Sequence, residues 1–234
     1  MSLPYFLTDS PSDGVLSGAE GRHAVTVKRI GVGERIMLTD GRGATAEVEV
    51  TEISDASTLR GKVIASQQVL AATPRVSVIQ AIPKAERAEL AVDLAVQGGA
   101  DEIVPWISHR TVARWPAHKQ GKQVEKWRHM AISAAKQSRR AWVPQVTEPV
   151  TTNQLAGVLA GKQVLVLHED ATTALREVQF SQDIALVIGP EGGIGEDEME
   201  LIGGVAVKLG PEVLRTATAA LAALSAIGVL SSRW

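Results

Sequence analysis

Hydrophobic and polar residues alternate along the early part of the chain, and this pattern predicts short β-strands. Residues 35–39 and 44–53 alternate on either side of Asp40-Gly41-Arg42-Gly43, a sequence typical of a hairpin turn. A further strand is expected over residues 59–64. Because short strands joined by tight turns are typical of small barrels, this part of the chain is expected to form one.

From residue 75 onward the pattern changes to buried strands that alternate with helices. The expected strands are residues 75–81, 102–105, 163–167, 184–188 and 205–209. The expected helices are residues 85–97, 122–140, 196–202 and 216–230. Such alternation is typical of a parallel α/β sheet. We therefore predict two domains, a β-barrel over residues 1–72 and a parallel α/β domain over residues 73–234.

Composition excludes several classes of protein. The chain has 234 residues, of which 45% are hydrophobic, enough to bury a core without covalent cross-links. It has no cysteine, which excludes a disulfide scaffold and a thiolate metal site and fits a reducing cytoplasm. The apolar stretch at residues 217–230 is shorter than the roughly 20 residues that cross a bilayer, and the start does not resemble a signal peptide. We expect a cytoplasmic protein with no membrane contact. Because the chain has no close pair of histidines, we also expect no metal.

The charge is distributed unevenly, although the net charge is only −2. Residues 106–147 contain nine Lys or Arg, one acidic residue and four of the five tryptophans. The basic residues are Arg110, Arg114, Lys119, Lys122, Lys126, Arg128, Lys136, Arg139 and Arg140. Basic side chains bind phosphates and aromatic rings stack on exposed bases. The alternative is a solvated helix face with tryptophans in the core, but such faces usually mix charges of both signs. Residues 106–147, which we call the basic window, therefore favour a nucleic-acid partner.

Polar or glycine-rich segments follow three of the predicted strands, at residues 168–170, 189–195 and 210–216. Open parallel sheets bind ligands at the carboxyl ends of their strands, and glycines let the backbone approach a ligand closely. The glycine spacing matches neither the dinucleotide fingerprint nor the P-loop, which argues against a dinucleotide oxidoreductase. Each segment alone is also typical of an ordinary turn, and a single histidine such as His168 is more often structural than catalytic.

In combination, these segments resemble the RsmE family, the 16S ribosomal RNA uridine-N3 methyltransferases of the SPOUT (trefoil-knot) superfamily. The motifs are Leu-Val-Ile-Gly-Pro-Glu-Gly-Gly at residues 186–193 and Leu-Gly-Pro-Glu-Val-Leu-Arg-Thr-Ala-Thr-Ala at residues 209–219. The resemblance continues through residues 23–29, 40–43, 84–89, 103–110 and 131–144. It covers nearly the whole chain in order.

This resemblance implies a PUA-like β-barrel that aids RNA binding, followed by a knotted α/β domain that binds S-adenosylmethionine. It also implies a homodimer, 16S ribosomal RNA of the small subunit as the substrate, and no metal. The implied cofactor-binding residues are Leu167, His168, Glu169, Ile188, Gly189, Pro190, Glu191, Gly192, Gly193, Leu209, Gly210, Val213, Leu214, Arg215 and Thr216. The expected RNA-binding residues are Lys28, Arg29, Lys84, Arg87, Arg110, Lys136, Arg139 and Arg140.

Methylation of uridine N3 requires loss of the N3 proton, and a cation near the base would stabilise the developing anion. We expect Arg215, Arg139 or Arg140 to provide this charge. The family commonly has Glu where this chain has Ala217, and Glu-Leu-Gly at residues 97–99, where this chain has Gln-Gly-Gly. The sequence therefore does not identify the general base. The alternatives are another SPOUT methyltransferase that acts on a ribose 2′-OH or on transfer RNA, and a non-catalytic RNA-binding assembly factor, which Ala217 slightly favours.

Overall fold

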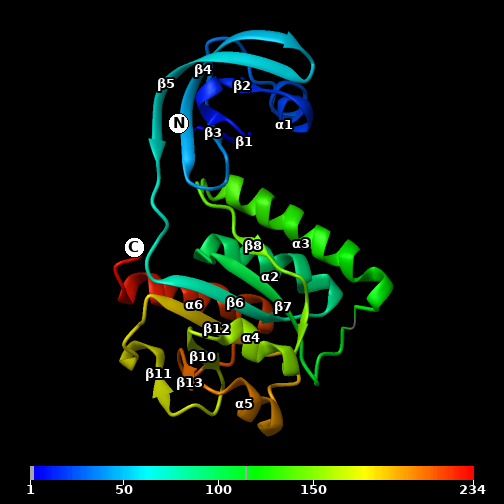
Figure 1. Ribbon diagram of the computed structural model, residues 1–234, viewed down its shortest axis with the longest axis vertical. Coiled ribbons are helices and arrows are strands. Elements are labelled where there is room, and N and C mark those ends of the chain that lie inside the picture. The colour runs from blue at the N-terminus through cyan, green and yellow to red at the C-terminus, as the bar shows by residue number, and fades with distance from the viewer. Residues whose placement is uncertain (1–2, 114) are drawn as a thin grey trace. The chain divides into compact units, whose positions relative to one another are not determined.

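The computed structural model describes residues 3–113 and 115–234, and its packing divides the chain into two compact units (Figure 1). The first unit combines the residues up to Ala71 with Ala135–Val143. The second unit combines Ala72–Ala134 with Pro144–Trp234. Residues 135–143 thus pack with a part of the chain from which they are distant in sequence.

The first unit is built on a sheet with the strand order β1-β3-β4-β5-β2. Its strands are β1 (Tyr5–Leu7), β2 (Val15–Leu16), β3 (Arg35–Thr39), β4 (Ala44–Asp55) and β5 (Thr58–Gln68). The predicted hairpin is confirmed, since β3 and β4 pair antiparallel and Asp40 accepts hydrogen bonds from the backbone of Arg42 and Ala44 across the turn. The strand expected at residues 59–64 is present and longer than predicted.

The alternating pattern did not predict the helices of the first unit. These are η1 (Pro11–Asp13), α1 (Gly18–Arg22) and the π-helical turn η2 (His23–Val27). Backbone and side-chain contacts attach residues 135–143 to the rest of this unit. Lys136 Nζ lies 2.6 Å from Glu20 Oε1, and Trp142 Nε1 donates a hydrogen bond of 3.0 Å to the carbonyl oxygen of Val69.

The second unit is built on a sheet with the strand order β11-β13-β10-β12-β6-β7-β8, with β9 paired to β7. The strands are β6 (Arg75–Ala81), β7 (Glu102–Ile107), β8 (Gln145–Val146), β9 (Val150–Thr151), β10 (Gln163–Leu167), β11 (Thr173–Ala174), β12 (Asp183–Ile188) and β13 (Val205–Lys208). The recorded strand pairings are parallel, which confirms the predicted α/β class.

Helices flank this sheet, as the alternation predicted. They are α2 (Ala85–Gly98), α3 (Ala117–Gln137), α4 (Leu155–Leu159), α5 (Glu196–Ile202) and α6 (Thr216–Leu230), with short turns η3 (Thr152–Gln154) and η4 (Leu175–Glu177). Helix α6 packs on α2 and on the central strands (Figure 1). Side chains of α4 and α5 share a separate buried cluster with strand residues such as Ile79, Trp106 and Val187.

The prediction for the long helix was wrong at both ends, because residues 122–140 were expected and the helix spans Ala117–Gln137. It ends early because Arg139 has a φ of +56°, a left-handed conformation. The amide of Arg140 then donates to the carbonyl of Ala135 over 2.9 Å, as in a Schellman-type helix end.

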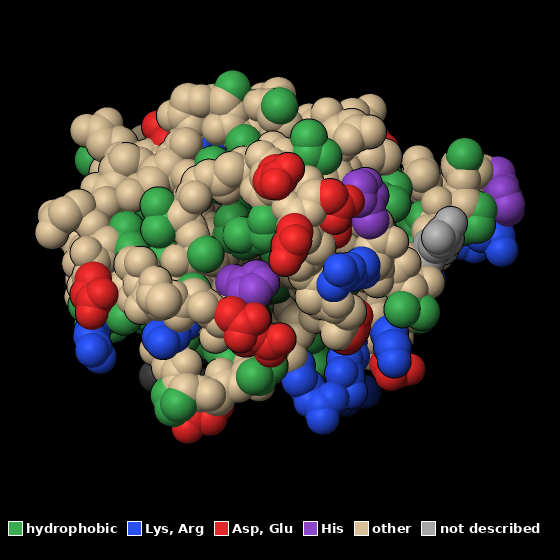
Figure 2. All heavy atoms as spheres, turned by 90° about the horizontal axis from the view of Figure 1, so that it is seen from below, with side chains coloured by type: hydrophobic (Ala, Val, Ile, Leu, Met, Phe, Trp, Pro, Cys, Tyr) green, Lys and Arg blue, Asp and Glu red, His purple; other side chains and the backbone are tan. Residues whose placement is uncertain are grey.

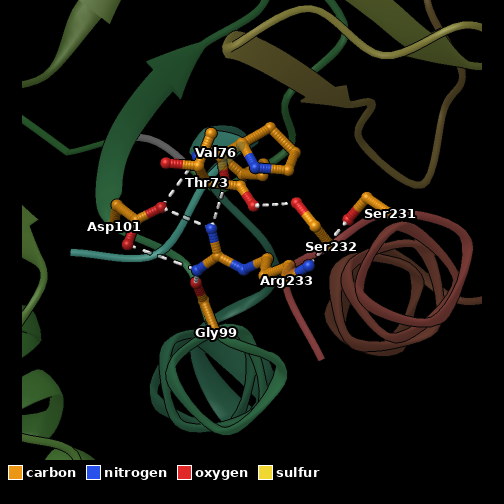
Figure 3. Close-up of polar contacts among 8 residues, drawn as sticks. Thr73, Val76, Gly99, Asp101, Ser231, Ser232 and Arg233 are labelled. Atoms are coloured by element: carbon orange, nitrogen blue, oxygen red, sulfur yellow. Dashed lines mark hydrogen bonds and ion pairs between the residues drawn. The ribbon is translucent and has the colours of Figure 1, made fainter. Parts of the chain in front are cut away.

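The C-terminal residues are held by a buried arginine, Arg233 (Figure 3). Its guanidinium donates to both carboxylate oxygens of Asp101, at 2.9 and 3.3 Å, and to the carbonyl oxygens of Pro74 and Gly99. Asp101 also accepts a hydrogen bond of 2.8 Å from the amide of Val76. The side chain of Arg233 is only 3% exposed. This arrangement ties the end of the chain to the beginnings of β6 and β7.

Candidate functional site

Three neighbouring strands of the second unit end at one cavity. Leu167 at the end of β10 pairs with Ile188 of β12 on one side and with Val207 of β13 on the other. The segments that follow these strands, together with the beginning of α6, surround a cavity of about 330 Å³. This is the edge of a parallel sheet at which ligands usually bind.

The predicted cofactor residues line this cavity, with the exception of Gly192. The cavity also contacts residues that were not assigned to the cofactor: Arg87, Ile194, Val207, Lys208, Glu212 and Ala219. Arg87 was expected to bind RNA, and Glu212 lies within the loop at residues 209–216 that was expected to hold the cofactor, although it was not named as a cofactor-binding residue. Val207 belongs to β13, before the motif at residues 209–219 begins, and Ala219 is the last residue of that motif and lies in α6.

Glycines shape the segment after β12. A Cβ atom on Gly189 would lie 2.8 Å from Ile194 Cγ1, closer than real Cβ contacts allow, and Ile194 is buried. Gly193 has a φ of +72°, which glycine adopts without strain, and its amide donates to the carbonyl of Pro190 over 3.0 Å. The segment can therefore turn tightly while its backbone faces the cavity.

The cavity has an apolar floor and a charged rim. Ile188, Val207 and Ala219 are buried, whereas Glu191 and Arg215 are exposed. His168 lines one side, and its Nδ1 accepts a hydrogen bond of 3.2 Å from the amide of Asp170. An apolar floor with a few polar groups at the rim is typical of sites for small organic ligands.

The predicted RNA-binding residues are divided between the two units. Lys28, Arg29, Lys136, Arg139 and Arg140 belong to the first unit, and Lys84, Arg87 and Arg110 to the second. Lys136 forms an ion pair with Glu20. Lys84 lies near the cavity, because its amide donates to Glu191 Oε1 over 3.4 Å. Arg114, which belongs to the basic window, lies outside the described residues.

Two tryptophans of the basic window are core residues. Trp106 and Trp127 are at most 1% exposed, and the Trp127 ring packs edge-on against Trp115 with centroids 5.2 Å apart. The rings of Trp106 and Trp127 are therefore not available for RNA bases to stack on. For these two residues the alternative interpretation, tryptophans in the core, is correct.

A second hollow, of about 420 Å³, opens beside the first, and three of its eight lining residues are acidic. It is lined by His168, Asp170, Ala171, Ile194, Glu196, Met199, Glu200 and Ala206. Figure 2 shows acidic side chains and histidines gathered on this side of the molecule. Carboxylates repel RNA phosphates, so this hollow is a poor surface for the RNA backbone.

Clustered metal ligands and membrane-spanning helices are both missing from the part of the chain that the structure describes. The described residues contain no group of three or more His, Cys, Asp or Glu side chains that could hold a metal ion. Among the helices of these same residues, none is both long and apolar enough to cross a membrane.

Comparison with known proteins gives the family. A model described as an RNA methyltransferase domain matches residues 71–228, and a model described as an RNA methyltransferase PUA domain matches residues 16–64. Ribosomal RNA small subunit methyltransferase E of Mycobacterium bovis is 45% identical over 97% of this chain and 90% of its own length. The protein of the same name in Bacillus subtilis is 29% identical over 91% of this chain and 88% of its own length.

A solved structure agrees with these relatives. It is a ribosomal RNA small subunit methyltransferase E from Neisseria gonorrhoeae, bound to S-adenosylmethionine. It is 25% identical to this chain, covers 98% of both chains and superposes with a TM-score of 0.87. The resemblance seen in the motifs is thereby confirmed, and the chain belongs to the RNA methyltransferase family, within it to the ribosomal RNA small subunit methyltransferase E (RsmE) group.

Proposed function

We propose that this protein transfers a methyl group from S-adenosylmethionine to N3 of a uridine in 16S ribosomal RNA. One observation carries the proposal. The segments after β10, β12 and β13, which the RsmE motifs mark as cofactor-binding, surround a single cavity of about 330 Å³. Family membership supports the same cofactor and the small ribosomal subunit as the substrate.

The residues of the cavity fit S-adenosylmethionine. A Cβ atom on Gly189 would collide with Ile194 of the cavity wall, so the absence of a side chain at Gly189 lets this segment keep its course along the cavity. The apolar floor of Ile188, Val207 and Ala219 suits a flat adenine ring, and residues 210–214, which are exposed, offer backbone carbonyls and, except at Pro211, amides. When bound, the cofactor supplies an electrophilic methyl group. The protein's part is to hold donor and acceptor in line, which can account for much of the rate.

Substitution of Gly189 by valine is expected to weaken S-adenosylmethionine binding about 10- to 100-fold. The new side chain would collide with Ile194 and displace the cavity wall, and overpacking of this kind costs about 1–3 kcal/mol. Titration calorimetry of the full chain measures the change. Gly157→Val is the matched control, because a Cβ atom on Gly157 would meet no other atom within 4 Å and Gly157 does not line the cavity. Equal affinities for the two variants would remove Gly189 from the cofactor site.

We assign the stabilising cation to Arg215, which is exposed at the rim of the cavity directly before α6. Its carbonyl accepts hydrogen bonds from the amides of Thr218 and Ala219, which fixes the backbone at the helix start. Arg139 and Arg140 remain the alternatives. Ala217 is 2% exposed and has no ionisable group, so we assign no general base at this position.

RNA binding is proposed to involve both units. The first unit matches a PUA model, so we propose that its sheet closes as a PUA-like barrel that contributes Lys28 and Arg29. In the second unit we propose the trefoil knot of the superfamily. Its support is that β13 pairs between β11 and β10, while the chain that follows returns as α6 to pack on α2.

We also propose that the protein acts as a homodimer in the cytoplasm. Large apolar side chains that a dimer would cover are exposed near the cavity, Val213 at 73% and Leu214 at 40%, and at the end of α6, Val229 at 72% and Leu230 at 48%. Sedimentation velocity of the full chain tests the dimer, since a monomer at micromolar concentration would contradict it.

The test of the function is methyl transfer from labelled S-adenosylmethionine to small ribosomal subunits from cells that lack this protein, followed by nucleoside analysis. Label in 3-methyluridine of 16S RNA is the expected result. Label on a ribose or in transfer RNA would assign the protein to another SPOUT activity. If neither methyl transfer nor cofactor binding is detected, a non-catalytic RNA-binding assembly factor would replace the proposal.

A further inference from the structure

The loop that follows β7 is connected to the first turn of α5 by a buried chain of hydrogen bonds. Trp106 Nε1 donates to Thr152 Oγ1 over 3.1 Å, and Thr152 Oγ1 donates to Glu198 Oε1 over 2.7 Å. The amide of His109 donates to the same carboxylate oxygen over 2.9 Å. These four residues come from β7, the loop after it, η3 and α5, so Glu198 joins segments that are distant in sequence.

The burial of Glu198 requires an explanation. Its side chain is 0% exposed, and within the described part of the chain its Oε2 has no hydrogen-bond partner. Burial of a carboxylate is costly, and an apolar side chain of similar size often gives equal or greater stability. What an apolar side chain cannot do here is accept the backbone hydrogen of His109. The geometry therefore points to a role in fixing that loop.

The next residue, Arg110, lies against the glycine-rich segment of the cofactor cavity. Its Nη1 lies 3.4 Å from the carbonyl oxygen of Gly192. A Cβ on Gly192 would be 3.3 Å from Arg110 Cβ, and a Cβ on Gly195 would be 3.4 Å from Arg110 Nη2. Because Gly192 and Gly195 have no side chain, Arg110 can lie close to the backbone of this segment. This also explains why Gly192, alone among the predicted cofactor residues, does not line the cavity.

A second contact holds the same loop from the solvent side. His109 Nδ1 lies 2.9 Å from Asp197 Oδ2, and this hydrogen bond holds the pKa of Asp197 below its usual range. Both side chains are largely exposed, so this contact is weaker than the buried one. Two consecutive acids of α5 thus hold the backbone and the side chain of the residue before Arg110.

We propose that Glu198 is a positioning residue that fixes the loop after β7, so that Arg110 binds a phosphate of the RNA next to the target nucleotide. This inference rests on the proposed function. Arginine suits phosphate because its planar guanidinium donates two parallel hydrogen bonds. Glu198 itself does not touch the substrate. Without it, the loop loses its buried anchor and Arg110 loses its fixed position beside the glycine-rich segment.

A double-mutant cycle tests the proposal. Arg110→Ala and Glu198→Ala are each expected to weaken binding of small ribosomal subunits about tenfold, with affinity for S-adenosylmethionine unchanged. Each is also expected to lower the slope of log affinity against log salt by about one phosphate contact. The double variant is expected to be no weaker than Arg110→Ala, because Glu198 acts through Arg110.

Two further variants separate positioning from general damage. Glu198→Gln keeps an acceptor for the His109 amide and is expected to restore subunit binding to within about threefold of the original protein. Glu200→Ala, on the exposed side of the same helix, is expected to change nothing. Additive effects of Arg110→Ala and Glu198→Ala, or a failure of Glu198→Gln to restore binding, would overturn the proposal. Because binding is measured without turnover, failure here is distinguishable from failure of the methyl-transfer proposal.

Discussion

Replacement of Arg215 by alanine is expected to lower kcat about 100- to 1000-fold in the methyl-transfer assay. Loss of the N3 proton leaves negative charge on the uracil ring, and one preorganised cation or donor at such a charge is typically worth this factor. Arg215 is exposed at the cavity rim and precedes a helix of 15 residues, whose N-terminal dipole adds positive potential at the same place. Single-turnover rates on subunits that lack the methyl group measure the effect.

Controls distinguish this role from binding. Arg215→Lys keeps the charge and is expected to retain part of the activity, because a lysine cannot reproduce the planar fork of donors. Arg176→Ala, at an exposed arginine that does not line the cofactor cavity, is expected to leave kcat unchanged. If Arg215→Ala turns over normally while Arg139→Ala combined with Arg140→Ala does not, the catalytic cation belongs to the first unit.

The fold class and the cavity segments could be predicted because they depend on local patterns. Apolar runs of strand length alternate with helical spacing, and this combination has one common solution, the parallel sheet. Ligands of such sheets gather at the carboxyl ends of the strands, so the segments after Leu167, Ile188 and Lys208 could be assigned to a site before their contacts were known. The hairpin around Asp40 follows from turn chemistry in the same way.

Three features of the structure depend on tertiary packing and could not be predicted from local sequence patterns. The helix that ends at Gln137 contains no residue that must stop it, and a left-handed arginine ends it instead of a glycine. Residues 135–143 pack within the first unit, although nothing in their sequence indicates a change of unit. The tryptophans of the basic window looked like base-stacking residues, but burial of Trp106 on β7 and of Trp127 on α3 depends on how these two elements pack.

The role proposed here for Glu198 was not predicted from the sequence, although a signal for its burial was present. It lies in the acidic run at residues 196–200, which is typical of an exposed helix start. Ile194, Glu198 and Ile202, however, follow one another at four-residue spacing, and all three are buried. An acidic residue at the spacing of a buried apolar helix face is the pattern that could have indicated that Glu198 is buried.

Removal of either partner of the Arg233–Asp101 pair is expected to destabilise the second unit by about 3–5 kcal/mol, the usual cost of removing one partner of a buried ion pair. Arg233→Ala would also deprive the carbonyls of Pro74 and Gly99 of a donor. Urea unfolding followed by circular dichroism measures the change. The double alanine variant is expected to lose less than the sum of the single losses, because each single variant already loses the same interaction between the two side chains.

The matched control is Arg35→Ala, which removes a half-exposed arginine from its ion pairs with Glu47 and Glu49. Pairs of this kind contribute at most about 1 kcal/mol, because water solvates both charges before and after folding. The comparison isolates burial, since both arginines pair with carboxylates at 2.9 Å but only Arg233 is enclosed. A loss for Arg233→Ala no larger than that for Arg35→Ala would mean that α6 and its packing, rather than the buried pair, hold the end of the chain in place.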